Sequence, residues 1–461
     1  MSMTSRWRFS GRRIRFLGYA ALLQAVAACS PAPPRNLVLI SLDTTRADHL
    51  PTYGYPRDTA PRIDRLARDS YVFLNAVAQW TTTSPSHSSM FTGLYPHTHG
   101  VGENTRLLAQ EFPTLAEILA GAGFRTGAFV SGYPLRVARE GLRQGFEVYD
   151  SDFEKMRRDG RQTTDLALGW LAERLPEERF FLFLHLYDAH GPYRPKDEYL
   201  ELFRSADPGP RLKHIPGYQQ RKHGKPLRHL NDYVDRYDAQ IRYQDDLVAE
   251  VLAALDLERT IVLVTADHGE TLDERARVLD HGKDVYDEQI RIPFVLHVPS
   301  HAGARLRPHV ETVDFLPTVL ELLAVPAPPS LAVQGESLVP LMTQARDSGR
   351  DDLAFASVYA YPKIYADRGY QLDRQRRIHA VRTRRWKLIV YPGVDNDYAE
   401  LYDLENDPLE RHNVAERHPD VRDGLLRAII SWHPSEVGTA VETELSAEDV
   451  KNLKALGYLG D

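Results

Sequence analysis

The chain has 461 residues, of which 43% are hydrophobic and 26% are charged, a composition typical of a soluble globular protein with a large core. Its formal net charge is −7, and five arginines in the first 28 residues leave about −12 on the remainder. That sign argues against a nucleic-acid partner, whose phosphates require a basic face. A small anionic substrate is not excluded, because a local metal ion or lysine can dominate the field inside a site.

The N-terminus has the pattern of a secretory signal peptide over residues 1–28. Five arginines and no acidic residue precede an uncharged run at 16–28 that ends in small residues. This run is too short to cross a bilayer of roughly 30 Å as a helix. The pattern therefore predicts an exported protein.

Cys29, the only cysteine, follows Val26-Ala27-Ala28 and so resembles the lipidated cysteine of bacterial lipoproteins. Residues 29–35 would then be the lipidated residue and a proline-rich linker. The alternative is a plain cleaved signal with no lipid. We predict a periplasmic or cell-surface bacterial lipoprotein that meets the membrane only through its anchor. The folded part then has no disulfide, no thiolate zinc site and no cysteine nucleophile.

Apolar runs alternate with helical patterns through residues 36–345. This alternation predicts a catalytic α/β domain with a mixed, mostly parallel sheet sandwiched by helices. The polar stretch 203–231 is predicted as a loop that overhangs the site. Strands are expected at 36–43, 125–131, 179–186, 260–266 and 292–298, and helices at 113–122, 163–175, 232–256 and 312–324.

Residues 346–461 have a different pattern and predict a small C-terminal antiparallel α+β subdomain. Paired strands are expected at 376–383 and 385–391, followed by a turn-rich segment at 400–409. Helices are expected at 415–431 and 445–458.

Acidic and imidazole side chains follow three of the predicted strands. Asp43 ends the first, Asp188 and His190 follow another, and Asp267-His268 ends a third. One acid at a strand end is as often a turn or helix cap, but three such places on one sheet edge indicate a ligand site. Carboxylates with imidazole suit a divalent ion such as Ca²⁺, Mg²⁺, Mn²⁺ or Zn²⁺.

Thr83 lies in a hydroxyl-rich segment, residues 80–93, that is predicted to start a helix. Pro85 disfavours helix at Ser84, and Ser86 can cap the following turns. A hydroxyl at a helix N-terminus faces oriented N–H groups that favour an anion. The alternative is an ordinary helix start without chemistry.

Successive motifs resemble the signatures of the sulfatase family, in the alkaline phosphatase superfamily. The resemblance spans nearly the whole mature chain in the right order and implies an α/β core with a small C-terminal antiparallel sheet. The motifs are 41–49 (SLDTTRADH), 83–93 (TSPSHSSMFTG), 95–101 (YPHTHGV), 185–193 (HLYDAHGPY), 265–270 (TADHGE), 281–293 (HGKDVYDEQIRIP) and 401–408 (LYDLENDP).

The resemblance implies a site with one divalent cation. By family, the expected ion is Ca²⁺. Asp43, Asp267 and His268 match its metal ligands, and Thr83 would complete the set. Thr44 stands where family members often have a second acid and is a further candidate metal ligand. The loss of an anionic ligand weakens a Ca²⁺ site, so the identity of the metal ion is left open.

The resemblance also implies the reacting groups. Thr83 falls at the position of the nucleophile, His190 and Lys283 at residues that contact the transferred group or protonate the leaving oxygen, and His281 is a second candidate acid. Asn104 and His87 are expected to bind substrate.

Two departures bear on the substrate. Thr83 cannot become formylglycine, which needs cysteine or serine, and His87 replaces the arginine of the modification signature. Threonine nucleophiles resemble those of phosphodiesterases and phosphoethanolamine transferases in the superfamily. We predict a sulfuric ester hydrolase acting on a small anionic ester, a sulfated glycan or an aryl ester. The alternatives are a phosphate or phosphonate ester hydrolase or phosphotransferase, and a catalytically dead lipid-anchored binding protein.

Overall fold

A computed structural model describes residues 34–220, 227–275, 278–344, 353–360, 376–392, 398–433, 441–442 and 446–455. The predicted signal peptide and Cys29 lie outside the described residues. From Pro34 onward the chain forms one compact unit. Within the ranges given, no helix has the length and apolarity needed to cross a membrane.

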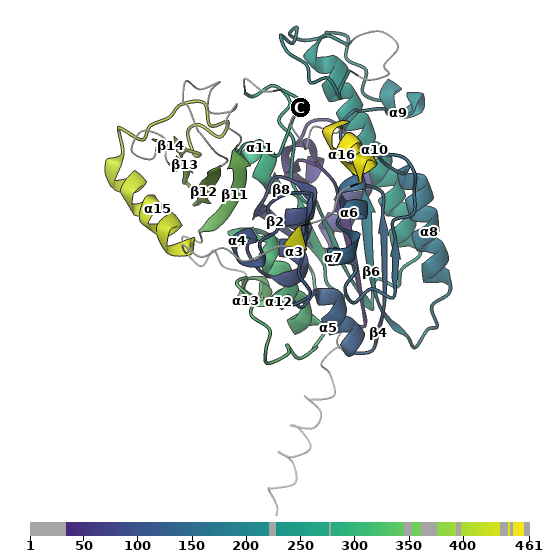
Figure 1. Ribbon diagram of the computed structural model, residues 1–461. Coiled ribbons are helices and arrows are strands. Elements are labelled where there is room, and N and C mark those ends of the chain that lie inside the picture. Colours follow the sequence, from purple (N-terminus) through teal and green to yellow (C-terminus); the bar gives the residue numbers. More distant parts are fainter. Residues whose placement is uncertain are drawn as a thin grey trace, which may run out of the picture. The chain divides into compact units, whose positions relative to one another are not determined.

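The main sheet has nine strands and is mostly parallel, as predicted (Figure 1). Only β8 (Arg291–Ile292) and β9 (Phe294–His297) run antiparallel to their neighbours. The strand expected at 292–298 is therefore the one that makes the sheet mixed. The order is β10 (Ala304–Glu311), β2 (Tyr71–Val77), β9, β7 (Thr260–Thr265), β1 (Asn36–Leu42), β6 (Arg179–Leu186), β4 (Phe124–Val130) and β5 (Val148–Asp150), with β8 paired to β2.

Helices cover both faces of this sheet because its central strands are apolar on both sides. In β1, Leu37 and Leu39 belong to one hydrophobic cluster, whereas Val38, Ile40 and Leu42 belong to the other. This is the two-residue alternation of a strand. The first cluster includes α3 (Thr83–Thr92), α5 (Leu115–Gly121) and α12 (Phe315–Leu322); the second includes α2 (Pro61–Arg68), α8 (Gly160–Ala172) and α10 (Leu230–Ala253).

A second, antiparallel sheet of four strands follows in the chain, also as predicted. Helix α15 (Pro419–Trp432) packs on it through Leu425 and Ile429. The segment 400–409 begins inside a strand and turns only after Asp403. The strands are β11 (Ala354–Ala360), β12 (Arg376–Arg382), β13 (Trp386–Tyr391) and β14 (Tyr398–Asp403).

Short elements complete the fold. The C-terminal β15 (Val441–Glu442) pairs with β3 (Arg106–Leu107), and α16 (Ala447–Ala455) follows it. The remaining short helices are α4 (Pro96–His99), α6 (Tyr133–Val137), α7 (Arg139–Leu142), α9 (Asp197–Glu201), α11 (Asp287–Ile290) and α13 (Val339–Gln344).

The strand register decides where the polar residues meet. Ser41 of β1 pairs with His185 of β6 on one side and with Thr265 of β7 on the other. The residues that follow these three adjacent parallel strands therefore leave the same edge of the sheet. This is the edge where ligands bind in open α/β sheets.

Candidate active site

Asp43, Asp267 and His268 meet at the carboxyl edge of the sheet. All three are fully buried, and one ligand atom from each lies within 4.8 Å of the others. Backbone groups orient Asp267, whose Oδ1 accepts from Thr44 N at 3.2 Å and from His268 N at 2.9 Å. The His268 ring is oriented by a bond from Nδ1 to Gly269 O at 2.9 Å.

Each of these residues keeps one polar atom without a hydrogen-bond partner among the described residues. The three atoms are Asp43 Oδ1, Asp267 Oδ2 and His268 Nε2. Buried acceptors without donors are costly in a folded protein. Two carboxylate oxygens and an imidazole nitrogen that face one another in this way fit a divalent cation.

The electrostatics of the centre fit a bound cation as well. Burial and the neighbouring Asp267 raise the pKa of Asp43 well above its usual value. Burial would also raise the pKa of Asp267, but His268, His87 and His185 outweigh it and lower this pKa to about 2. Burial lowers the pKa of His268 to about 4, so its imidazole is neutral at pH 7 and has a lone pair to give.

Thr83 is the first residue of α3 and its hydroxyl lies against this centre. Thr83 Oγ1 donates to Asp43 Oδ2 at 3.3 Å. The next backbone amide, Ser84 N, donates to Asn104 Oδ1 at 2.8 Å, whereas Asn104 Nδ2 has no partner among the described residues. Asn104 is 3% exposed, so a free amide donor is held near the start of α3. Asn104 and Thr83 therefore lie close together at the start of α3.

Thr44 has a backbone role here. Its φ is 55°, its N–H holds Asp267, and its hydroxyl donates to Asp43 O at 2.8 Å. The hydroxyl predicted as a metal ligand is therefore directed to the main chain in this structure.

His87 is held inside the protein rather than at a substrate surface. Its Nδ1 donates to Thr83 O at 2.8 Å, and its Nε2 accepts from Ser41 Oγ at 2.9 Å. Because both ring nitrogens are used, none is left for the substrate that His87 was expected to bind. His87 instead fixes the first turn of α3, and thereby Thr83.

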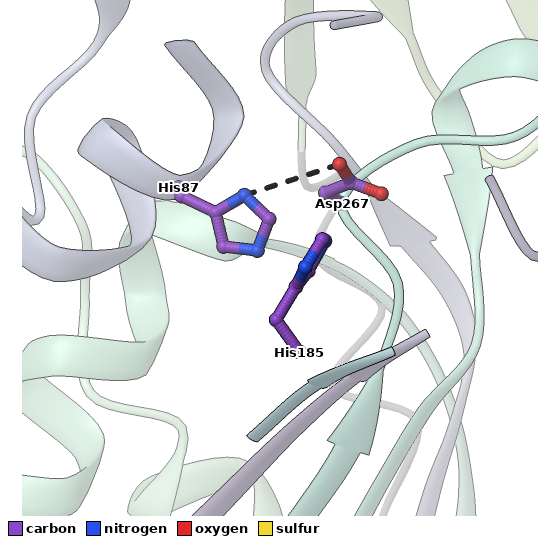
Figure 2. A group of neighbouring side chains, drawn as sticks. All are labelled: His87, His185 and Asp267. Carbon is purple, nitrogen blue, oxygen red and sulfur yellow. Dashed lines mark ion pairs between the residues drawn. The ribbon is translucent and has the colours of Figure 1, made fainter. Parts of the chain in front are cut away.

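His185 was not singled out by the sequence, yet it belongs to the centre. Its Nε2 donates to Asp43 Oδ2 at 3.0 Å. Figure 2 shows His87 and His185 turned toward the Asp267 carboxylate, with His87 Nδ1 3.9 Å from Asp267 Oδ2. The signal was present: a histidine inside the apolar strand 179–186 is out of place in a core unless it has a polar partner.

His190 and His281 lie beside the centre, as expected for candidate acids. The His281 ring centroid is 4.6 Å from that of His268 and 4.9 Å from that of His190. His190 stacks on Tyr187 at 4.2 Å and donates from Nδ1 to Gly191 O at 2.6 Å. Burial lowers the pKa of His190 well below its usual value, which makes it a weak proton carrier in the free protein.

Glu270, a second residue that the sequence did not single out, supports His281. Glu270 Oε1 accepts from His281 Nδ1 at 3.0 Å, and Oε2 accepts from Tyr193 OH at 2.9 Å. A buried carboxylate on one ring nitrogen fixes the orientation and the tautomer of an imidazole. Glu270 thus orients the His281 ring, and both His190 and His281 lie beside the centre as candidate acids.

Lys283 lies in a segment beside the start of α3, where Thr83 is. Its Nζ pairs with Asp280 Oδ2 at 2.6 Å, and its side chain is 21% exposed. The preceding Gly282 has a φ of 75°, and a Cβ there would come within 2.6 Å of Thr82. Segment 281–283 therefore passes directly beside the start of α3.

The fold and the site define an α/β protein with a buried carboxylate and imidazole centre next to a hydroxyl at a helix start. The model of the sulfatase family matches residues 35–325. A second model, the C-terminal part of N-sulphoglucosamine sulphohydrolase, matches residues 279–428. The chain belongs to the sulfatase family and is an enzyme of the sulfuric ester hydrolase type.

Relatives are distant but cover most of the chain. Arylsulfatase K of Xenopus laevis is 24% identical in an alignment 470 residues long, gaps included. The alignment covers 89% of this chain and 85% of that protein. The ulvan-active sulfatase of Formosa agariphila is 24% identical over 408 residues, 80% of this chain and 77% of that protein.

Solved structures share the fold at lower identity. The phosphonate monoester hydrolase of Agrobacterium radiobacter superposes with a TM-score of 0.71 at 21% identity, covering 90% of this chain and 99% of that one. BT4656, solved with its substrate D-glucosamine-2-N,6-O-disulfate, gives a TM-score of 0.70 at 19% identity, covering 87% and 97%.

Proposed function

We propose that this protein is a metal-dependent sulfatase that uses Thr83 as its nucleophile and acts on a sulfated saccharide. The observation that carries the proposal is the bond from Thr83 Oγ1 to Asp43, a carboxylate whose other oxygen faces the unpartnered atoms of Asp267 and His268. The proposal includes export through a signal peptide at residues 1–28 and a lipid anchor on Cys29. The saccharide substrate is supported by relatives whose names refer to ulvan and to a glucosamine disulfate.

Asp43, Asp267 and His268 would hold the cation. When bound, a divalent cation supplies Lewis-acid polarisation of an ester oxygen and of the Thr83 hydroxyl. A site with only two carboxylates and one imidazole suits Mn²⁺ or Zn²⁺ as well as Ca²⁺ or Mg²⁺.

The residues divide the reaction into two displacements. In the first, Thr83 Oγ1 gives its proton to Asp43 Oδ2 and bonds to sulfur, while the bond from sulfur to the sugar oxygen breaks. His281, backed by Glu270, protonates that leaving oxygen. Asn104 Nδ2 and Lys283 stabilise the negative charge on the transferred group.

In the second displacement, water replaces Thr83 on sulfur. The water gives a proton to His281, its oxygen bonds to sulfur, and the bond from sulfur to Thr83 Oγ1 breaks. Asp43 returns the proton to Thr83. Sulfate leaves, and every group regains its starting state.

A phosphorus ester is the second candidate substrate. Thr83 lacks the aldehyde chemistry that formylglycine would supply, and an alcohol nucleophile serves phosphorus as well as sulfur. The likeness of fold to phosphonate monoester hydrolase is compatible with this alternative. Phosphate monoesters, diesters and phosphonates are therefore included in the test.

The test compares matched aryl sulfate, phosphate monoester, phosphate diester and phosphonate substrates with the metal-loaded protein and with Thr83→Ala. Preference for sulfate with an inactive variant supports the proposal. Preference for a phosphorus ester moves the assignment to the second candidate. Undiminished activity of Thr83→Ala contradicts a covalent threonine, and inactivity on every ester favours a binding protein.

A further inference from the structure

A cavity of about 840 Å³ adjoins the candidate active site. Tyr187, Gly191 and Pro192 line it, and the ring of Tyr187 stacks on the catalytic-site His190 at 4.2 Å. The cavity and the site thus share one wall. A ligand that occupies both the active site and the cavity must therefore extend beyond the reacting ester.

The charge of the cavity lining is balanced. Five lysine or arginine side chains and five carboxylates line it, together with four aromatic rings. A site for a second sulfate or phosphate would need an excess of cations. Donors and acceptors in equal number beside aromatic faces instead suit an uncharged ring that carries many hydroxyl groups.

The lining is held in place before any ligand binds. Lys196 Nζ lies 4.2 Å from the centroid of the Tyr243 ring, and Tyr243 OH donates to Asp159 Oδ1 at 2.5 Å. Groups that are already ordered lose little conformational entropy on binding.

Arg157 connects the cavity to the active-site loop. It lines the cavity and donates to His190 O at 2.9 Å and to Pro192 O at 3.1 Å. The loop that carries His190 is therefore braced from the cavity side. Tyr218, on the predicted overhanging loop, donates to Leu279 O at 2.6 Å and forms part of the same lining.

We propose that this cavity binds the uncharged sugar unit next to the one that carries the scissile ester. This inference rests on the proposed sulfatase function and adds a class of substrate: a sulfated saccharide of at least two units with a neutral neighbour. The carboxylate of a sugar acid in that place would meet as many carboxylates as cations, so its charge would add little binding free energy.

The test uses Gln162, which lines the cavity from α8. In Gln162→Trp an indole takes up part of the cavity. The matched control is Leu166→Trp, one helical turn later, at a side chain that is 42% exposed and outside the lining. Both variants are made in the full chain.

The substrates are a panel of monosulfated disaccharides of glucose, galactose and N-acetylglucosamine, the corresponding sulfated monosaccharides, a disaccharide with a uronic acid neighbour, and p-nitrophenyl sulfate. For at least one neutral disaccharide we expect KM to be roughly tenfold lower than for its monosaccharide. Gln162→Trp should remove this advantage and leave turnover of p-nitrophenyl sulfate unchanged, and Leu166→Trp should keep it.

Equal KM values for all disaccharides and monosaccharides in the wild type would overturn the inference while leaving the sulfatase function intact. An equal loss of turnover of the disaccharide and of the aryl ester in Gln162→Trp would also overturn it. A preference of the wild type for the disaccharide with a uronic acid neighbour would do the same. If no sulfate ester is turned over, the proposed function fails, and binding of the unsulfated disaccharides is measured by saturation-transfer NMR. Binding that Gln162→Trp abolishes then supports the cavity as a sugar site, and absence of binding overturns it.

Discussion

Thr83 and His185 donate hydrogen bonds to the same oxygen of Asp43. Thr83 Oγ1 lies 3.3 Å and His185 Nε2 lies 3.0 Å from Oδ2. Oδ1 of the same carboxylate has no hydrogen-bond partner among the described residues. The Asp43 side chain therefore links the Thr83 hydroxyl to the candidate cation site.

Thr83→Ala should abolish turnover while Thr83→Ser retains much of it. Removing a nucleophile lowers kcat by on the order of 10³-fold or more, whereas serine keeps the hydroxyl. Steady-state kinetics measures both, and intact-mass spectrometry of acid-quenched wild type should show a sulfate adduct. Similar activity of the alanine and serine variants would refute Thr83 as the attacking group.

His185→Gln should weaken both metal retention and turnover. Loss of an oriented partner of a metal ligand typically costs roughly 10-fold to 100-fold in affinity or activity. Metal content by mass spectrometry and kcat are the readouts, with the exposed His301→Gln as control. A wild-type metal content in His185→Gln would mean that Asp43 keeps its orientation alone.

Removing divalent cations should destabilise the protein, since Asp43 and Asp267 then face each other without a cation between them. Re-adding a cation that binds the folded state at 100 times its Kd raises the free energy of unfolding by about 2.7 kcal/mol. Thermal unfolding with chelator and with added Ca²⁺, Mg²⁺, Mn²⁺ or Zn²⁺ measures this gain. Asp267→Asn should lose most of it, and a gain of the same size in that variant would place the cation elsewhere.

Glu311 should make stability depend on pH. Burial and the nearby Asp314 raise the pKa of Glu311 from 4.5 to about 8. Because the folded state holds this proton more tightly, the stability it contributes is complete below pH 4.5 and is lost as the pH rises toward 8. The loss is on the order of a few kcal/mol.

Glu311→Gln should remove this loss, because glutamine does not ionise and can still accept from Gln79 and Phe355. Denaturant unfolding at pH 6 and pH 9 compares the variant with wild type, using the exposed Glu416→Gln as control. An identical pH dependence in Glu311→Gln and wild type would mean that Glu311 is ionised in the folded state.

The sequence predicted the central strands well because they are long and continuously apolar. The strand expected at 179–186 agrees with β6 at both ends, and the one at 36–43 differs from β1 by one residue. By contrast, β2 and β10 carried no strand prediction. β10 lies at the edge of the sheet and includes arginines and a proline, so its pattern is weaker.

The sequence drew attention to residues that follow a predicted strand or stand in a motif, and it passed over residues that act through another side chain. Asp43, Thr83, Asp267 and His268 lie together in the structure. His185 and Glu270 escaped notice because their role depends on the side chains they touch, which only the folded chain shows. The use of both His87 nitrogens, one by Ser41 and one by Thr83, had no sequence signal for the same reason.

The pairing of β15 with β3 has a consequence for how the protein matures. Every residue placed in the reaction, from Asp43 to Lys283, is synthesised before the chain reaches the four-stranded antiparallel sheet. Helix α16 nevertheless supplies Glu448 and Asn452 to the cavity wall, and Asp449 accepts from Tyr133 OH of α6. A segment that follows all of these groups in the chain thus finishes the rim of the cavity. A chain cut short before residue 441 would have the reacting groups without the completed cavity, and full recognition of a long substrate would require residues 441–455.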